Sequence, residues 1–215
     1  MNNFIIDFDS TFIKVESLDE LFKISSPNNT KKINEFNSIT NDGMNGRLTF
    51  MKSLSMRIKL LEADKNDIFN TVNHLQKMVT SSFVKNEIFF KKNKENIYIV
   101  SSGFHEMIDP IVQKYHIIKK NIYANNFTFD KNGNIIGIDT NNPLSKTKGK
   151  VEIIKNLKLK GTTHVIGDGF TDYEIKKEGY AEYFYLFIEN IKREPLINNA
   201  DFLLKSLEQL NRIIK

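Results

Sequence analysis

Two aspartates, Asp7 and Asp9, stand two residues apart directly after the apolar run at residues 4–6. In an extended chain, residues two apart project to the same side, while Phe8 between them turns toward the core. Carboxylates held this close repel each other unless a cation or a shared proton intervenes. A hard divalent cation such as Mg²⁺ prefers carboxylate oxygens and would relieve that repulsion. Taken alone, the pair fits a helix cap equally well.

Three later segments carry residues of a similar kind, each next to an apolar run. Asp168 and Asp172 stand four apart among glycines, so both face one side if a helix begins there. Ser101 offers a hydroxyl and neighbouring backbone amides to an anion. Lys148 precedes an apolar helical pattern and could balance the charge of a phosphoryl group. Each residue alone is more typical of a cap, a turn or a charged surface, but the set in this order favours catalysis.

The elements that must position these residues alternate between strand and helix patterns. Short apolar runs predict buried strands at residues 4–6, 96–100, 163–166 and 183–188, and the first three end in small or acidic residues. Buried strands alternating with helices are typical of an α/β fold with a Rossmann-like, doubly wound parallel sheet. Such sheets bind ligands beyond the carboxyl ends of their strands. Asn132-Gly133, between residues 125 and 138, predicts a β-hairpin.

The interval between the first two strands is too long for a simple crossover. Apolar residues recur at helical spacing throughout residues 15–77, with turns around Pro27 and Gly43. We therefore predict an inserted cap of three or four helices. The predicted domains are an α/β core of residues 1–14 and 80–215 and a helical cap subdomain of residues 15–79. Lys14 and Ser81 are the expected hinges.

Composition limits the remaining function classes. The 215 residues include no cysteine, which excludes disulfides, thiol catalysis and thiolate zinc sites. The net charge is +5, but the lysines are scattered in short pairs, so we expect no nucleic-acid partner. Since no segment reaches the roughly 20 apolar residues of a membrane span, we expect no membrane partner and a cytoplasmic location. A homodimer stays open.

The order of these sites resembles the four motifs of the haloacid dehalogenase superfamily: Asp-x-Asp-x-Thr, then Ser or Thr, then Lys, then Gly-Asp-Gly-x-x-Asp. Within it, the chain is most similar to the phosphoserine phosphatase branch. Residues 7–11 read Asp-Phe-Asp-Ser-Thr and Glu16 follows five residues later; residues 44–57 match the cap pattern Met-x-Gly-x-Leu-x-Phe…Ser-Leu…Arg. Residues 100–104 resemble Val-Ser-Gly-Gly-Phe. The resemblance extends from Ile5 to about Phe202.

The resemblance implies a Mg²⁺-dependent phosphoric monoester hydrolase that works through an aspartyl phosphate. Asp7 would be the nucleophile, and Asp9 would act first as general acid and then as general base. Lys148 would complete the catalytic set and hold the phosphoryl oxygens together with Ser101. The implied metal-binding residues are Asp7, Asp9 through its backbone carbonyl, Asp168 and Asp172.

The resemblance also implies O-phospho-L-serine as the small phosphorylated substrate. Glu16 would meet its ammonium and Arg57 its carboxylate, and one anion with one cation suits a zwitterion. Plain surface roles for both residues stay an alternative. The other implied substrate-binding residues are Met44 and Phe50 as an apolar lid, with Ser102, Gly103 and Thr171.

Three departures from the family pattern bear on the substrate rather than the chemistry. Ser102 replaces a glycine, Phe170 replaces a small residue, and residues 183–190 replace a smaller run near the site. A phosphatase or phosphotransferase for another small phosphomonoester therefore stays open. A phospho-accepting signalling domain is disfavoured, because such domains lack an acid equivalent to Asp9 and a helical cap. A catalytically inactive scaffold is disfavoured by the four intact motifs.

Overall fold

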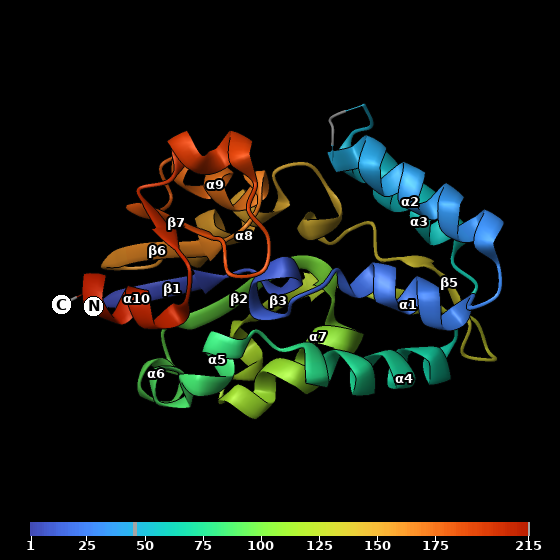
Figure 1. The fold of residues 1–215 in the computed structure, drawn as a ribbon, viewed down its shortest axis with the longest axis horizontal. Helices are drawn as coiled ribbons and strands as arrows, with labels where there is room; N and C mark the ends of the chain where they lie inside the picture. The colour runs from blue at the N-terminus through green and yellow to red at the C-terminus, as the bar shows by residue number, and fades with distance from the viewer. Residues whose placement is uncertain (45–46, 215) are drawn as a thin grey trace.

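A six-stranded parallel sheet forms the centre of the computed structural model, which describes residues 1–44 and 47–214 (Figure 1). The strand order is β3-β2-β1-β6-β7-β8, so the chain winds outward in both directions from β1, and the predicted doubly wound α/β fold is confirmed. Its strands are β1 (Asn2–Ile6), β2 (Ile97–Phe104), β3 (Ile122–Asn125), β6 (Thr162–Gly167), β7 (Tyr183–Phe187) and β8 (Phe202–Leu204). The sequence did not predict the two edge strands: β3 contains Ala124 and Asn125, which are uncommon in strands, and β8 has a single buried residue, Leu204.

Alternating residues of the central strand supply two separate cores. Phe4 and Ile6 of β1 pack into the core on one face of the sheet, and Ile5 packs into the core on the other. The helices on the Ile5 face are α8 (Gly149–Leu157) and α9 (Phe170–Lys177). The helices on the opposite face are α5 (Ser81–Lys85), α6 (Glu87–Asn93), α7 (His105–Val112) and α10 (Leu207–Ile213). This burial on both faces explains why the strand patterns are continuously apolar.

The described residues of the interval 15–79 form four α-helices, in agreement with the predicted three or four. They are α1 (Ser17–Ser25), α2 (Thr30–Met44), α3 (Phe50–Leu60) and α4 (Lys65–Leu75). Thr49 caps α3, and Asp64 forms a reciprocal capping box with Asp67 at the start of α4. Such caps satisfy backbone N–H groups that have no partner inside the helix. The assignment of these helices to a separate cap subdomain stays a prediction.

The helical insert contacts the core through its linkers, through the packing of α4 against α7 and through a β-hairpin. Its two linkers run side by side, with an antiparallel bridge between Ile13 and Val79. The predicted hairpin is confirmed as β4 (Phe127–Phe129) paired with β5 (Ile135–Ile138). It reaches the insert through Ile135 N–H, which donates to the Ala63 carbonyl at 2.8 Å. The hairpin therefore links the core to the insert far from the linkers.

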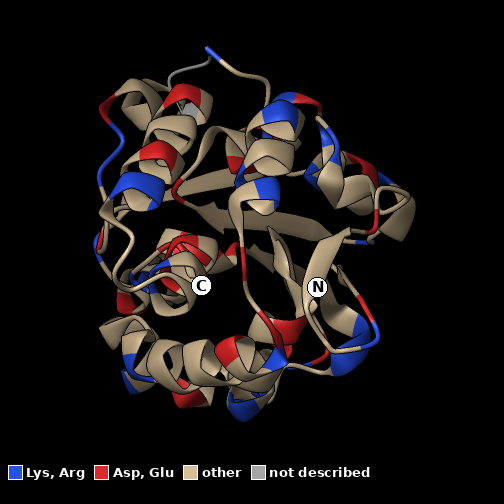
Figure 2. Cartoon of the chain, turned by 90° about the vertical axis from the view of Figure 1, so that its right-hand side faces the viewer, with Lys and Arg blue, Asp and Glu red and all other residues tan. Residues whose placement is uncertain are grey.

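Short helical turns fill the remaining connections. They are η1 (Phe8–Phe12), η2 (Gln76–Met78), η3 (Gln113–Tyr115), η4 (Lys119–Asn121), η5 (Pro143–Ser145) and η6 (Glu194–Asn199). Figure 2 shows lysines and arginines spread over helices on both sides of the sheet. None of the described helices combines the length and the apolar character that crossing a bilayer requires.

Candidate active site

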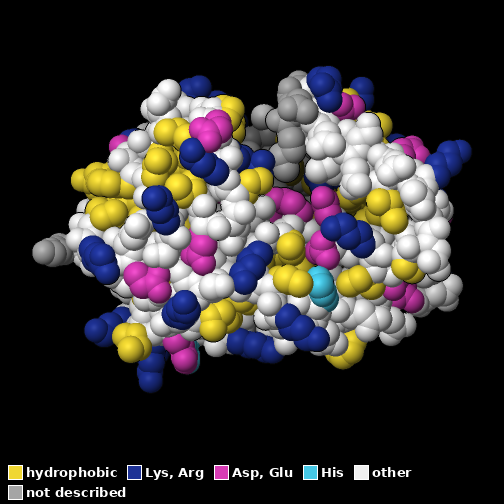
Figure 3. Space-filling model, viewed as in Figure 1, with side chains coloured by type: hydrophobic (Ala, Val, Ile, Leu, Met, Phe, Trp, Pro, Cys, Tyr) yellow, Lys and Arg dark blue, Asp and Glu magenta, His cyan; other side chains and the backbone are white. Residues whose placement is uncertain are grey.

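The carboxyl ends of β1, β2 and β6 open into a cleft of about 880 Å³ between the sheet and the helical insert. Figure 3 shows the molecule hollowed between its left and right parts, with acidic side chains gathered at the bottom of the hollow. Most of the predicted site residues line this cleft: Asp7, Asp9, Glu16, Phe50, Arg57, Ser101, Ser102, Gly103, Asp168 and Thr171. Met44 ends α2, and its side chain lies outside the described part of the chain. The structure therefore brings most of the predicted site residues together in one cleft.

Asp7 stands at the end of β1, where the chain turns into η1. Its Oδ1 accepts a hydrogen bond from the backbone N–H of Phe8 at 2.7 Å. The turn requires Ser10 to adopt a left-handed conformation, with φ of 54°. Since Phe8 is fully buried, its ring fixes the turn while the carboxylate of Asp7 faces the cleft. The strand and the turn thus hold one carboxylate oxygen in a defined orientation.

The lysine of the site is Lys150, and the prediction of Lys148 is wrong. Lys148 has 53% of its side chain exposed and pairs with Glu178 at 2.7 Å, outside the cleft. Lys150 has only 4% exposed, and its Nζ lies 2.8 Å from both Asp7 Oδ1 and Asp172 Oδ1. Lys148 therefore forms an ion pair at the surface, whereas Lys150 bridges two buried carboxylates of the site.

The start of α8 explains this correction. The helix begins at Gly149, so Lys148 precedes it, whereas Lys150 shares its buried face with Val151 and Ile154. A β-carbon on Gly149 would lie 2.2 Å from the carbonyl oxygen of Pro143, so only glycine allows this close packing. A signal was present in the sequence, because Lys150 and Ile154 are four residues apart and must face the same side.

Asp7, Asp168 and Asp172 form a buried acid cluster. Each offers a carboxylate oxygen, and these oxygens lie within 4.8 Å of one another. Burial, with the charge of Asp7 adding to it, raises the pKa of Asp168 to about 6 and that of Asp172 to about 8. Burial lowers the pKa of Lys150, but the charges of Asp172 and Asp7 outweigh it and raise the pKa overall.

The donor set of the acid cluster fits a hard divalent cation. Three buried carboxylates crowd together with too little positive charge, and Mg²⁺ prefers oxygen ligands of this kind. Gly167 permits the crowding, because a β-carbon there would lie 2.2 Å from the carboxyl carbon of Asp172. The carboxylate of Asp9 is not a member of the cluster, and a contribution from its backbone carbonyl stays a prediction.

Asp9 has surroundings that suit a proton donor. Burial and, to a smaller extent, the charge of Glu16 raise its pKa well above the ordinary value. Its Oδ1 accepts the backbone N–H of Ser17 at the start of α1 at 2.7 Å. Ser101 is buried nearby, and its Oγ accepts the backbone N–H of Gly103 at 3.0 Å. The raised pKa keeps Asp9 protonated at a pH where an ordinary aspartate is ionised.

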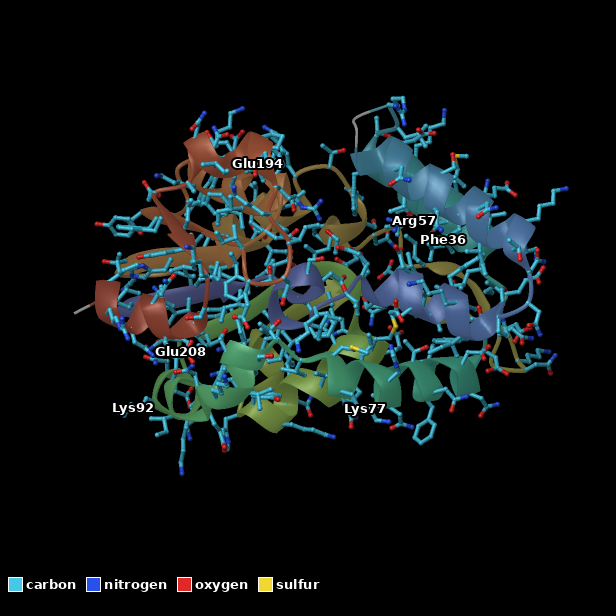
Figure 4. The ribbon with its side chains drawn as sticks, in the orientation of Figure 1. Phe36, Arg57, Lys77, Lys92, Glu194 and Glu208 are labelled. Carbon is cyan, nitrogen blue, oxygen red and sulfur yellow. The ribbon has the colours of Figure 1, made fainter. Side chains whose placement is uncertain are left out.

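Glu16, Asp19 and Arg57 form the cap-side group at the other end of the cleft. Arg57 lies in α3 beside the ring of Phe36, 5.8 Å from its centroid (Figure 4). Its Nη1 is 3.6 Å from Asp19 Oδ1, and among the described residues its buried Nε has no hydrogen-bond partner. Glu16 accepts a hydrogen bond from Ser10 Oγ at 2.7 Å. This end therefore contains two carboxylates and one guanidinium, and among the described residues the buried Nε of that guanidinium has unused bonding capacity.

Known proteins are similar to this chain in both sequence and fold. No protein-family model matches it. A chloroplastic phosphoserine phosphatase from Arabidopsis thaliana is 30% identical over 207 residues, which cover 95% of this chain and 68% of that protein. A solved phosphoserine phosphohydrolase-like protein from Francisella tularensis is 30% identical over the whole of both chains, with a TM-score of 0.88. The chain belongs to the phosphoserine phosphatase branch of the haloacid dehalogenase superfamily.

A third comparison supports the fold alone. A solved phospho-aspartyl intermediate analogue of phosphoserine phosphatase is 24% identical, with a TM-score of 0.78 and coverage of 99% of this chain and 98% of that one. The Arabidopsis and Francisella relatives, at 30% identity, establish the chain as a phosphatase-type hydrolase.

Besides Lys150, a second residue of the site, Arg193, was not predicted from the sequence. Arg193 follows β7, lines the cleft and donates from Nε to Asp168 Oδ2 at 2.7 Å. Its Nη2 lies 3.8 Å from Glu16 Oε1. A lone arginine in an irregular segment gives no periodic signal, although residues 183–190 just before it had marked this region as unusual for the family. Arg193 therefore joins the acid cluster to the cap-side group.

Proposed function

We propose that this phosphatase is a Mg²⁺-dependent phosphomonoesterase that hydrolyses O-phospho-L-serine through an aspartyl phosphate on Asp7. The observation that carries the chemistry is the buried bridge from Lys150 to Asp7 and Asp172, beside an Asp9 whose pKa is raised. It combines an oriented carboxylate nucleophile, a fixed cation and a protonated acid in one cleft. That combination is what transfer of a phosphoryl group to a carboxylate requires.

The first step transfers the phosphoryl group to the protein. A carboxylate oxygen of Asp7 attacks phosphorus, and the bond between phosphorus and the serine oxygen breaks. Asp9 donates its proton to the departing serine oxygen. Lys150 neutralises charge at Asp7, and the hydroxyl of Ser101 together with nearby backbone amides binds the phosphoryl oxygens. Asp7, Asp168 and Asp172 would hold Mg²⁺, which supplies further positive charge to the transferring group.

The second step restores the protein. Asp9, now ionised, takes a proton from water, whose oxygen attacks phosphorus and displaces the Asp7 carboxylate. Phosphate leaves, and Asp9 is again protonated for the next cycle. Both steps use one acid in opposite roles, which requires a pKa between those of an ordinary aspartate and the leaving alcohol.

The proposed substrate follows from the cap-side group and from the relatives named phosphoserine phosphatase. The carboxylate of Glu16 suits an ammonium group, and the guanidinium of Arg57 suits a carboxylate. Phe50 provides an apolar side of the cleft. A phosphomonoester carrying both charged groups would use every one of these contacts.

A substrate panel with and without Mg²⁺ tests this function. O-phospho-L-serine, phosphoethanolamine, glycerol phosphate and p-nitrophenyl phosphate differ in their ammonium and carboxylate groups. We expect phosphoserine to have the highest kcat/KM and all turnover to require the cation. If another small phosphomonoester has a higher kcat/KM, that compound replaces phosphoserine as the proposed substrate, and the proposed chemistry stands. Full turnover in excess chelator would contradict the metal-dependent chemistry.

A further inference from the structure

We propose that Arg193 is a positioning residue that orients Asp168 for the cation, a role that rests on the proposed Mg²⁺-dependent function. Arg193 lies outside the four motifs and reaches the acid cluster from the segment after β7. Its guanidinium would act through Asp168 rather than on the substrate.

Both carboxylate oxygens of Asp168 have a hydrogen-bond donor. Oδ2 accepts from Arg193 Nε at 2.7 Å, and Oδ1 accepts from Thr11 Oγ1 at the longer distance of 3.4 Å. Two donors on opposite oxygens define the plane of the carboxylate, and the shorter, charge-assisted bond contributes more. Donors behind a metal-binding carboxylate orient it and tune its affinity. Arg193 has the geometry of such a donor.

The two cations of the cluster serve different carboxylates. Lys150 lies 2.8 Å from Asp7 and from Asp172, whereas Arg193 pairs with Asp168. Asp168 is buried, so an unpaired charge there would be costly. Among the described residues, Arg193 is the cation recorded in contact with this carboxylate. The division explains why this chain needs a second cation beside the buried lysine.

The segment that carries Arg193 is fastened on both sides. Nδ2 of Asn190 lies 2.7 Å from Thr80 Oγ1 and 3.1 Å from the carbonyl of Ser10, in the turn after the nucleophile. Glu189 accepts the backbone N–H of Ser82 at 3.1 Å. After Arg193 the chain enters η6, which has Pro195 in its first turn. A guanidinium delivered from a fixed segment can orient a carboxylate, because little conformational freedom is lost.

Titration of Mg²⁺ into the substrate-free full-length protein by calorimetry tests the proposal. Outer partners of metal ligands change metal affinity by about 10- to 100-fold, so we expect Arg193→Gln to weaken Mg²⁺ binding by that factor. Arg193→Lys keeps the charge but loses the planar guanidinium, so its Mg²⁺ affinity should lie between those of the wild type and Arg193→Gln. Lys192→Gln removes the same charge from the neighbouring residue, whose ammonium pairs with exposed Glu194, and should bind like wild type.

The direction of the change decides between positioning and competition. Equal or tighter binding in Arg193→Gln would overturn the proposal, because Arg193 would then merely compete with the cation for Asp168. We also expect high Mg²⁺ to restore most of the lost kcat, which it would not do for a general packing defect. If a thermal melt shows that Arg193→Gln is unfolded, the comparison of Arg193→Lys with the wild type is the test, and we expect weaker Mg²⁺ binding in Arg193→Lys.

The wild-type protein separates this proposal from the proposed function. Wild-type Mg²⁺ binding together with poor phosphoserine turnover would refute the substrate and leave the role of Arg193 standing. Wild-type Mg²⁺ binding with unchanged affinity in Arg193→Gln would refute the role of Arg193 alone. Absence of Mg²⁺ binding by the wild-type protein would overturn both.

Discussion

The acid cluster and the cap-side group differ in how closely their charged side chains are paired. In the acid cluster, Lys150 contacts Asp7 and Asp172 at 2.8 Å, and these side chains are almost completely buried. In the cap-side group, the closest approach of Arg57 to Asp19 is 3.6 Å, and the buried Nε of Arg57 has no hydrogen-bond partner among the described residues. Both regions hold buried charges, but only the first pairs them within hydrogen-bonding distance.

This difference separates chemistry from selection. The paired groups of the acid cluster lie at the end of a packed strand and in the first turns of two packed helices, so their positions are fixed before any substrate arrives, which favours stabilisation of a transition state. A buried guanidinium with an unmet donor costs free energy that an incoming carboxylate can recover. We therefore expect the acid cluster to control kcat for every phosphomonoester, and the cap-side group to discriminate among them.

The largest effect is expected for Asp7→Asn, which removes the nucleophile. Turnover should fall on the order of 10⁴-fold or more for every substrate, as for other covalent catalysts. Steady-state assays on phosphoserine and p-nitrophenyl phosphate measure it, with a thermal melt to verify folding. Residual activity near wild type on either substrate would break the assignment of Asp7.

Lys150→Gln should produce the next largest effect. Loss of the fixed cation beside Asp7 should lower kcat by about 10²- to 10³-fold for all substrates. Lys148→Gln is the matched control, since Lys148 makes an exposed ion pair with Glu178. Equal losses of kcat in both variants would contradict the assignment of Lys150 as the lysine of the site.

Arg57→Ala should have a smaller effect that depends on the substrate. We expect kcat/KM for phosphoserine to fall by about 10- to 100-fold, the range for losing a charge-assisted contact. Hydrolysis of p-nitrophenyl phosphate, which has no carboxylate, should change little. If both substrates lose activity equally, Arg57 supports the fold rather than recognition, and the contrast between the two regions fails.

The smallest effect concerns the stability of the metal-free protein. Because the pKa values of Asp168 and Asp172 are raised to about 6 and about 8, the folded protein binds more protons than the unfolded chain above about pH 4. The free energy of unfolding should therefore fall as the pH rises from about 4 to about 8. Mg²⁺ binds the ionised carboxylates and should raise Tm by about 5–10 °C at pH 8, but less at pH 5.5.

Melting curves at the two pH values, with Mg²⁺ or with a chelator, measure this linkage. Potassium chloride at matched ionic strength controls for screening. A Tm gain that is equal at both pH values would show that the acid cluster does not control the linkage.

Local sequence by itself predicted four strands of the sheet, the helical insert, the hairpin and the edge of the sheet where the candidate site lies. Apolar runs identify β1, β2, β6 and β7, because strands buried on both faces carry a dense local signal. Asp7, Asp9, Ser101, Asp168 and Asp172 are predicted from their order along the chain, their places beside apolar runs and their resemblance to the family motifs. The edge strand β3 lacks that signal, because it contains Ala124 and Asn125, which are uncommon in strands.

Only the tertiary structure decided which cations serve the acid cluster. Three lysines lie within residues 146–150, and the exact start of α8, set by the packing of Gly149 against Pro143, turns Lys150 inward and leaves Lys148 at the surface. Arg193 reaches Asp168 from 25 residues away, because β7 lies beside β6 and Asn190 fastens the segment that follows. The spacing of Lys150 and Ile154 places this lysine on the apolar side of a helix but does not show which carboxylates it contacts. The contact of Arg193 has no local pattern, since sheet order is a property of the packed chain.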